Sequence, residues 1–457
     1  MRRRMTVALG LGASVVVLIV LARNAVPLAA QGSQTPARSA ETAYPVFLPL
    51  ALRNWFSVGP HFALGYGPYR AGQAPGGAQP ATAQMAEDLA LMRPETNLIR
   101  LYNACGVWAT AAAQAEQQGF HIYQGAALTG NLAGNQSELD CFAASVAAHD
   151  NVLGGIVGNE VLLRGDLSES ALIGYIQQAQ AVSSAPVGTA ETWDTWCNLS
   201  APAPRCPGRP GLGAAVEWVV AHVHPYWEGT PVEHGAAQVV TAYLALRAAY
   251  PGKPVTVGET GWPTCGDTVG AAVPGLANQE RFIEDLWHWT KEFDLPIVYF
   301  EAFDEPWKTA DEGAAGACWG LTNVSRAAKH NDLDWTAPTR PAPGATPAVY
   351  IEHPVGNATT TTNSSCAIPV FGRVDHAGPG WHVKVEVLTN QWYVQDKWYV
   401  DGLAPITDGL WGMPEVVLGG QGAFNNHSIR ATLLDGHGST QASVVVTDVV
   451  RGNACVP

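Results

Sequence analysis

The feature that most constrains the fold is an alternation of short apolar strands with helical segments, which repeats from about residue 62 to residue 300. Strands joined through helices run parallel, because a parallel pair needs a long crossover and a helix usually supplies it. Eight such units over roughly 280 residues have the size of a (β/α)8 barrel, whereas a doubly wound open sheet usually has fewer units and a Gly-rich phosphate loop. The expected strands are residues 62–68, 97–102, 120–125, 152–158, 185–189, 218–223, 253–258 and 296–300.

Helical periodicity fills most of the gaps between these strands. Ser137 and Ser168 each precede such a segment, and we expect both to be N-caps, because a Ser side chain accepts a hydrogen bond from a free N–H of the first turn. The expected helices are residues 82–92, 107–118, 137–149, 168–183, 235–250 and 278–292.

The regions outside the barrel differ from it in composition. Arg2, Arg3 and Arg4 precede an apolar run over residues 7–22, the pattern of an export signal or, if it is not cleaved, of an N-terminal anchor. After a Pro-rich stretch the helical pattern ends, and residues 381–387 alternate strictly between apolar and polar. The expected organisation is a signal peptide or anchor (1–30), a tether (31–56), an α/β (β/α)8 TIM barrel (57–336), a Pro-rich linker (337–349) and a small all-β sandwich (350–457).

Export would place the 8 cysteines in an oxidising compartment, where they can pair. Sequence does not determine the connectivity, but proximity in the chain and in the expected fold favours one set. No Cys-x-x-Cys or His-x-x-x-His spacing occurs, so we expect no metal site. The favoured pairs are Cys105–Cys141, Cys197–Cys206, Cys265–Cys318 and Cys366–Cys455.

Two expected strands end in a glutamate. Glu160 follows the apolar segment 154–159, and Glu259 follows residues 253–258, just before a turn forced by Gly261 and Pro263. Burying an unpaired carboxylate costs several kcal/mol or drives its protonation, so packing alone rarely explains one at this place. A structural salt bridge is the alternative for either glutamate taken alone, but it explains two matching strand ends poorly.

The carboxyl ends of parallel barrel strands converge at one face, where active sites form. Strands four and seven lie on nearly opposite sides, so Glu160 and Glu259 can meet over the mouth of the barrel. Two carboxyl groups about 5 Å apart perform retaining glycoside hydrolysis, in which one attacks the anomeric carbon and the other moves the proton. We expect the proton donor to have a raised pKa, and Asn159 to bind the sugar 2-hydroxyl.

Composition is compatible with a neutral polymeric substrate. The net charge of -14 argues against nucleic acid, which needs a basic protein surface. The 16 Trp residues offer flat faces for sugar rings, although a large core also uses Trp. The sequence indicates no cofactor and no protein partner.

Several motifs resemble glycoside hydrolase family 17, the β-1,3-glucanases. Residues 257–266, Val-Gly-Glu-Thr-Gly-Trp-Pro-Thr-Cys-Gly, resemble the family's nucleophile signature, and residues 157–161, Val-Gly-Asn-Glu-Val, its acid/base strand. Residues 99–102, 224–227 and 301–308 are similar to its second-, sixth- and eighth-strand segments, in the correct order. The resemblance implies a retaining barrel enzyme that hydrolyses or transfers β-1,3-glucosyl units.

Carried over residue by residue, the resemblance makes Glu259 the nucleophile and Glu160 the general acid/base. Lys308 near Glu305 forms a plausible ion pair beside the site, either structural or in contact with substrate. We interpret His222 and His224 as core histidines rather than ligands. The residues expected to line the cleft or orient its carboxylates are Tyr66, Tyr102, Tyr226, Glu301, Glu305 and Lys308, and the candidate stacking platforms, each of which can equally be loop core, are Trp193, Trp196, Trp262 and Trp307.

The chain departs from plant members of the family in two places. The loop over residues 192–213 and the C-terminal β domain are additions. Such a loop can close one end of a cleft, so the sequence does not decide between endo-hydrolysis, exo-hydrolysis and transfer. The β domain is either carbohydrate-binding or an immunoglobulin-like spacer filled by its aromatics. The aromatics in question are Trp392, Tyr393, Trp398, Tyr399 and Trp411.

The sequence therefore predicts a secreted or surface-anchored retaining hydrolase that acts on β-1,3-glucan polysaccharide or oligosaccharide. The first alternative is a β-1,3-glucanosyltransferase, in which a sugar acceptor replaces water. The second is a non-catalytic glucan-binding protein. It predicts the loss of one carboxylate, whereas both Glu160 and Glu259 are present.

Overall fold

The computed structural model describes residues 62–94, 96–331, 333, 344–356, 359–362, 366–419 and 426–452. The expected signal or anchor, the tether, residues 337–343 of the linker and Cys455 lie outside these residues. Among the helices of the described segments, none is both long and apolar enough to cross a membrane.

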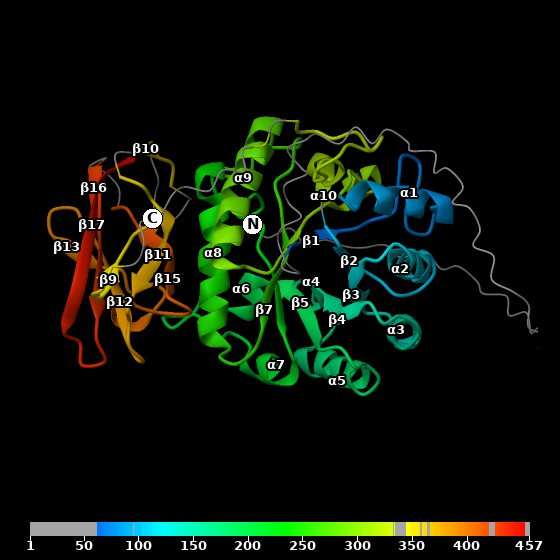
Figure 1. Cartoon of the computed structure of the whole chain (residues 1–457), viewed down its shortest axis with the longest axis horizontal. Helices are drawn as coiled ribbons and strands as arrows, with labels where there is room; N and C mark the ends of the chain where they lie inside the picture. Colours follow the sequence, from blue (N-terminus) through cyan, green and yellow to red (C-terminus); the bar gives the residue numbers. More distant parts are fainter. Residues whose placement is uncertain are drawn as a thin grey trace, which may run out of the picture.

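Eight parallel strands close into a barrel, as the alternation in the sequence predicts (Figure 1). Closure is complete because β1 pairs with β2 on one side and with β8 on the other, with Phe62 opposite Ile297. The strands are β1 (Phe62–Gly65), β2 (Leu98–Leu101), β3 (His121–Ala126), β4 (Val152–Asn159), β5 (Val187–Thr192), β6 (Val219–His222), β7 (Val255–Thr260) and β8 (Ile297–Tyr299).

Two small apolar clusters formed by barrel-strand side chains stand apart from the main core. Trp218, beside β6, packs with Ile156 and Val220, and Tyr123 bridges this cluster to a second one around Leu98. The Trp218 ring needs space that only glycine provides, because a Cβ on Gly154 would lie 2.8 Å from that ring. The main core lies between the strands and the surrounding helices and continues into the C-terminal domain.

The helices surround the barrel, and the largest difference from the expected boundaries is at the start of α3. Ser168 caps its helix as expected, accepting from the N–H of Ala171. The helix expected to start after Ser137 begins earlier, at Leu132, because the Asn131 side chain accepts from the N–H of Gly134 and starts it there. The helices are α1 (Thr82–Met92), α2 (Val107–Gln117), α3 (Leu132–Ala148), α4 (Val161–Arg164), α5 (Glu169–Gln180), α6 (Trp193–Trp196), α7 (Pro210–Ala215), α8 (Val232–Ala249), α9 (Leu276–Phe293) and α10 (Thr309–Glu312), with 3-10 turns η2 (Pro306–Lys308) and η3 (Gly313–Ala317).

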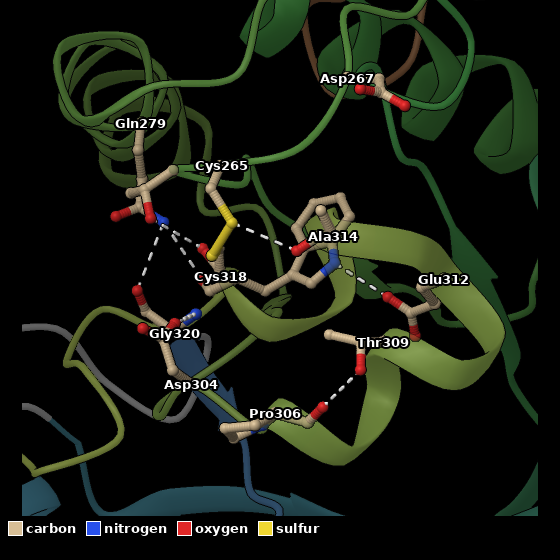
Figure 2. The surroundings of a disulfide bond; sticks show 12 residues. Cys265, Asp267, Gln279, Asp304, Pro306, Thr309, Glu312, Ala314, Cys318 and Gly320 are labelled. Carbon is tan, nitrogen blue, oxygen red and sulfur yellow. Dashed lines mark hydrogen bonds between the residues drawn. A yellow bond between two sulfur atoms is a disulfide. The ribbon is translucent and has the colours of Figure 1, made fainter.

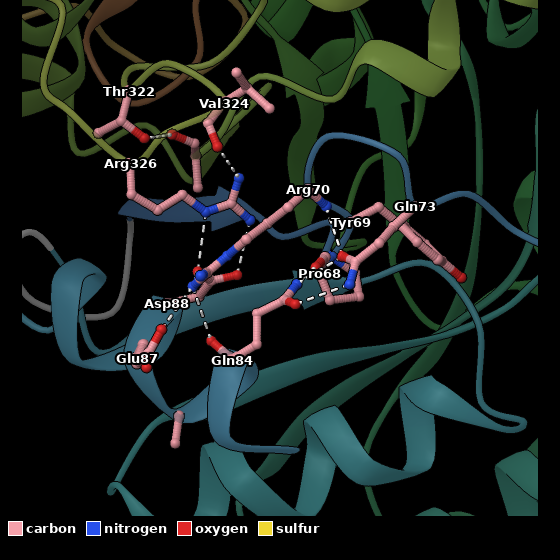
Figure 3. A network of polar contacts seen from close by, with 12 residues as sticks. Pro68, Tyr69, Arg70, Gln73, Gln84, Glu87, Asp88, Thr322, Val324 and Arg326 are labelled. Carbon is pink, nitrogen blue, oxygen red and sulfur yellow. Dashed lines mark hydrogen bonds and ion pairs between the residues drawn. The ribbon is translucent and has the colours of Figure 1, made fainter. Parts of the chain in front are cut away.

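A buried carboxylate ties the first and last parts of the barrel together. Asp88 of α1 is fully buried and accepts hydrogen bonds from Arg70, which follows β1, at 2.7 Å and from Arg326, which follows β8, at 2.8 and 2.9 Å. Figure 3 shows both guanidinium groups converging on Asp88. Breaking a buried pair of this kind typically costs about 3–5 kcal/mol, because it leaves an uncompensated charge.

The C-terminal domain consists of two β-sheets, in agreement with the expected sandwich. One sheet has the order β10-β17-β16-β12-β13, with β14 also paired to β12, and the other has the order β15-β11-β9. Figure 1 shows β11 and β15 lying beside α8. The elements are β9 (Ala348–Val349), β10 (Thr359–Thr360), β11 (Ala367–Asp375), β12 (His382–Leu388), β13 (Trp392–Val394), η4 (Val400–Gly402), β14 (Leu403–Pro405), β15 (Leu410–Val417), β16 (Asn426–Leu434) and β17 (Thr440–Arg451).

Three of the four expected disulfides are confirmed. They are Cys105–Cys141, Cys197–Cys206 and Cys265–Cys318. The fourth expected pair, Cys366–Cys455, cannot be described because Cys455 lies outside the described residues.

Candidate active site

Glu160 stands at the carboxyl end of β4 in an unusual backbone conformation. Gly158 has φ 88°, and Glu160 itself has φ 53° and ψ 34°, in the left-handed region that costs a non-glycine residue about 1 kcal/mol or more. Glu160 is the N-cap of α4, and the fully buried Glu191 of β5 accepts from the N–H groups of Leu162 and Leu163 in that helix. The neighbouring strand therefore holds the turn that carries Glu160.

Glu259 occupies the matching place near the end of β7 and is 6% exposed. Its Oε1 accepts a hydrogen bond from Arg100 Nη1 at 3.1 Å, and its Oε2 lies 3.2 Å from His224 Nε2. Arg100 comes from β2 and is itself buried, 1% exposed, so its charge acts on Glu259 with little screening by water.

His222 of β6 connects the two glutamates. Its Nδ1 lies 2.7 Å from Glu160 Oε1, and its Nε2 lies 2.8 Å from Arg100 Nη1 and 3.5 Å from Glu259 Oε1. Because Arg100 can only donate, we assign Nε2 of His222 as the acceptor, which places the proton on Nδ1, donating to Glu160. One oxygen each of Glu160 and Glu259 and a ring nitrogen of His222 lie within 4.8 Å of one another.

The contacts set the charge of both carboxylates. Burial alone would raise the pKa of Glu259, but His222, Arg100 and His224 together hold it far below its usual range. Burial likewise opposes ionisation of Glu160, yet the hydrogen bond from His222 lowers its pKa below the ordinary value. The prediction that the proton donor has a raised pKa is therefore wrong, because His222 donates a hydrogen bond to Glu160 rather than accepting one from it.

The three donor groups are also close enough to hold a metal ion. The guanidinium of Arg100 already contacts both His222 and Glu259, however, and its charge opposes a second cation there. The residues fit a paired-acid site better than a metal site.

A second buried charge cluster lies after β8. Lys308 of η2 contacts Glu301 and, at 2.8 Å, Glu305, which confirms the expected Lys308–Glu305 ion pair. Burial works against the ammonium, but the two carboxylates raise the pKa of Lys308 well above its usual range. Burial raises the pKa of Glu301 strongly, and its Oε1 has no hydrogen-bond partner within the described part of the chain. Oε1 of Glu301 can therefore form a further hydrogen bond, for example with a ligand.

Tyr102 and Asn159 lie next to the two glutamates. The Tyr102 hydroxyl has no hydrogen-bond partner among the residues described, and the Arg100 guanidinium stacks 4.7 Å from the centre of its ring. Gly65 makes room for that hydroxyl, because a Cβ there would lie 2.7 Å from it. Asn159 Oδ1 accepts from Arg100 Nη2 at 2.5 Å, so its amide N–H groups are its donors to a ligand.

Several expected cleft residues are placed elsewhere. Tyr66 is fully buried and donates to Asp88, so the sequence interpretation of Tyr66 as a cleft residue is wrong. Trp196 and Trp262 are fully buried, and Trp193 is 4% exposed, so none offers an open face to a sugar ring. Tyr226 donates its hydroxyl to the carbonyl of Asp267 at 2.5 Å.

Trp307 and Trp227 remain as candidate stacking platforms. Trp307 is only partly buried. Trp227 is 40% exposed; it lies in the sixth-strand motif and was not among the predicted platforms.

The interpretation of His222 and His224 as ordinary core histidines is also wrong, since both contact the paired carboxylates. Arg100 and Glu191 received no role from the sequence. Each carried a signal, because a charged residue within a short apolar barrel strand either binds another charge or forms part of a site.

The β7 loop that follows Glu259 is fixed by a disulfide. Cys265 is bonded to Cys318 just after η3, and Gln279 of α9 donates to the carbonyls of Trp262 at 2.7 Å and Gly320 at 3.3 Å (Figure 2). These links join the β7 loop to the segment after β8, so the two sides of the site have a fixed spacing.

Comparison with known proteins agrees with this geometry. Residues 63–320, more than half of the chain, match the model of the BtgE/BtgC glycoside hydrolase domain. A glucan 1,3-β-glucosidase of Arthroderma benhamiae is 27% identical over 267 residues, which cover 54% of this chain and 84% of that protein.

Solved structures show the same fold. A glycoside hydrolase family 17 β-1,3-glucanosyltransferase from Rhizomucor miehei is 26% identical with a TM-score of 0.51, covering 60% of this chain and 97% of that one. An active-site mutant of the Rhizomucor miehei β-1,3-glucanosyltransferase, in complex with laminaritriose, is 25% identical with a TM-score of 0.52, covering 61% and 98%.

Proposed function

The chain belongs to the BtgE/BtgC glycoside hydrolases, in glycoside hydrolase family 17, and we propose that it cleaves β-1,3-glucan with net retention. Glu259 is the nucleophile and Glu160 the general acid/base. The substrate is supported by the names of its relatives, a glucan 1,3-β-glucosidase and a β-1,3-glucanosyltransferase in complex with laminaritriose.

The observation that carries retention is the spacing of the two carboxylates. Oxygens of Glu160 and Glu259 lie within 4.8 Å of each other. Retaining glycosidases place the two carboxyl groups about 5–5.5 Å apart, whereas inverting enzymes separate them by about 6.5–9.5 Å to admit a water molecule. The spacing supports direct attack by Glu259 on the anomeric carbon.

The contacts divide the two roles. Arg100 and His224 keep Glu259 ionised, as a nucleophile must be. His222 donates to Oε1 of Glu160, so the proton for the leaving oxygen is carried on Oε2. That proton leaves with the departing sugar, and the ionised Glu160 then takes a proton from the water that releases the product. The hydrogen bond from His222 favours this second, basic role.

Transfer to a sugar acceptor is the second candidate, because both solved relatives are named glucanosyltransferases. The same glycosyl-enzyme serves both reactions, and the acceptor alone differs. Export is also part of the proposal, supported by the Arg2–Arg4 segment with its apolar run and by three disulfides.

The test follows products from defined β-1,3-gluco-oligosaccharides in wild type, Glu259→Ala, Glu160→Ala and the control Glu217→Ala. Glu217 is an exposed carboxylate that accepts from the N–H of Val187 at the start of β5, far along the strand from the mouth. We expect Glu217→Ala to be active and Glu259→Ala to be inactive. On an aryl β-glucoside whose leaving group needs no proton, Glu160→Ala should form a β-glycosyl azide when azide is supplied, since azide needs no general base.

An α-glycosyl azide would refute retention, and full activity of Glu259→Ala would refute its role as nucleophile. Products longer than the substrate would identify transfer. Absence of wild-type turnover on β-1,3-linked chains would refute the proposed substrate.

A further inference from the structure

The C-terminal domain makes extensive contact with the barrel. Gly412 of β15 lies directly against α8, where a Cβ would be 3.1 Å from Leu244 and 3.3 Å from Thr241. Trp289 of α9 packs edge-on against Phe371 of β11, with ring centres 4.9 Å apart. A docked, close-packed face of this kind fixes the domain on the barrel.

Buried polar groups extend the same interface. His234 Nδ1 of α8 lies 2.7 Å from His353 Nε2, and His234 Nε2 is hydrogen bonded to Thr360 of β10. The backbone N–H of Thr361 also donates to Glu233 at 3.3 Å. A satisfied buried network specifies one relative position of two surfaces more sharply than apolar contact alone.

From this fixed position the domain also supports the loop that follows β5. Trp398 stacks on Trp193 with ring centres 5.3 Å apart and planes 13° apart, and the Arg205 guanidinium lies 5.3 Å from the Trp398 ring. Arg205 Nη1 also donates to Glu415 of β15 at 2.7 Å. Trp398 is 1% exposed, so its contacts with the loop are buried.

The contact continues from this loop to the loop after β6. Trp193 Nε1 donates to Glu228 Oε1 at 2.7 Å, and Gln238 of α8 donates to Glu228 Oε2 at 2.6 Å. Glu228 directly follows Trp227, whose exposed ring packs 5.8 Å from Trp319.

Trp227 lies close to the reacting groups. The Trp319 ring packs 5.4 Å from His224, which contacts Glu259. A single ring, that of Trp319, therefore separates Trp227 from His224, whose side chain contacts Glu259.

We propose that the C-terminal domain is a fixed brace which, through Trp398, Trp193 and Glu228, positions Trp227 as a stacking platform for glucose units beyond the cleaved bond. This inference concerns how the proposed β-1,3-glucan cleavage selects chain length, and it rests on that proposed function. In this arrangement Trp398 and Arg205 are positioning residues, and Trp227 determines preference for chain length. The domain acts on the cleft through the barrel loops and not as a separately tethered sugar-binding module.

Kinetics on two substrates test the brace in the full chain. Trp398→Ala and Arg205→Ala should raise KM for β-1,3-glucohexaose about tenfold, while kinetics on an aryl β-glucoside stay within about twofold of wild type. Trp398→Phe, which keeps an aromatic face, should restore most of the affinity. Asp408→Ala is the matched control, because Asp408 pairs with Arg247 of α8 at 2.7 Å on the same interface.

Trp227→Ala should reproduce the loss of hexaose affinity. If the brace acts through Trp227, the double variant Trp398→Ala/Trp227→Ala should be no worse than Trp227→Ala alone. Additive losses, or equal losses on both substrates, would overturn the proposal.

Hydrogen exchange gives a readout that does not depend on the substrate. Exchange over residues 193–213 and 224–230 should be faster in Trp398→Ala and Arg205→Ala than in Asp408→Ala, with α1 and α2 unchanged in all three. Unchanged exchange in these two loops would overturn the brace even if wild-type activity on β-1,3-glucan is confirmed. Faster exchange without wild-type activity on that glucan would uphold the positioning and refute the proposed substrate.

Discussion

Replacing His222 tests how the site sets its working pH. The Nδ1 of His222 donates to Glu160 at 2.7 Å within a ring that is almost completely buried, 1% exposed. A hydrogen bond to a charged group contributes about 1.5–3 kcal/mol, and one pKa unit corresponds to about 1.4 kcal/mol. Loss of this bond should therefore raise the pKa of Glu160.

The sign follows from the role of Glu160. As general acid it must be protonated in the free enzyme, so kcat/KM falls as pH rises through its pKa. Because His222 lowers that pKa and Glu259 has a lower one, the wild-type optimum should lie at acidic pH. In His222→Phe, which keeps a ring but no donor, the alkaline limb should move to higher pH.

The assay is the pH dependence of kcat/KM on a β-1,3-gluco-oligosaccharide, with circular dichroism to establish folding at each pH. His222→Gln, which can still donate from its amide, is the matched control and should shift the alkaline limb less than His222→Phe. The acidic limb should move less than the alkaline one, since Arg100 and His224 still contact Glu259. An alkaline limb that stays in place, or moves to lower pH, would refute the assignment of His222 as donor to Glu160.

Three further predictions concern stability and binding. Ser replacement of both Cys265 and Cys318 should lower the free energy of unfolding by about 4 kcal/mol, for a closed loop of 53 residues. Denaturant titration checks this, and an unchanged midpoint would contradict it. Burial lowers the pKa of His234 to about 3 and that of His353 well below its usual value, so stability should be full above about pH 6.5 and fall below it by roughly 1.4 kcal/mol per pH unit for each imidazole. Thermal unfolding of wild type and His353→Gln checks this, and a variant with the same acid slope as wild type would argue against it. Tyr102→Phe removes a buried hydroxyl without a partner in the described chain, so stability should hold while kcat/KM falls about tenfold; unchanged kinetics would exclude contact with the transition state.

The barrel and its paired acids were predictable because they depend on local pattern. Apolar strands alternating with helices specify a parallel sheet, and closure of that sheet brings its strand ends to one face. The positions of Glu160 and Glu259 at two such ends followed from the sequence alone. Three disulfides were also predictable, since their partners lie near each other in the chain or at neighbouring strand ends.

The surroundings of the paired acids were not predictable, because they join strands that are far apart in the chain. Whether Tyr66 lines the cleft or donates to Asp88 depends on the direction of a side chain just after a strand, and the sequence periodicity does not indicate that direction. His222 is as buried as a core residue, yet its two ring nitrogens contact Arg100 of β2 and Glu160 at the end of β4.

The sequence by itself thus determined a (β/α)8 barrel with two glutamates at matching strand ends, because strand periodicity and strand ends are local properties. Only the tertiary structure decided which charges surround those glutamates and therefore the direction of their pKa shifts. It also decided that the C-terminal domain docks on α8 and stacks Trp398 on Trp193. These contacts depend on distances of a few ångströms between segments separated by tens to hundreds of residues, which chain closure and domain packing set and local pattern does not.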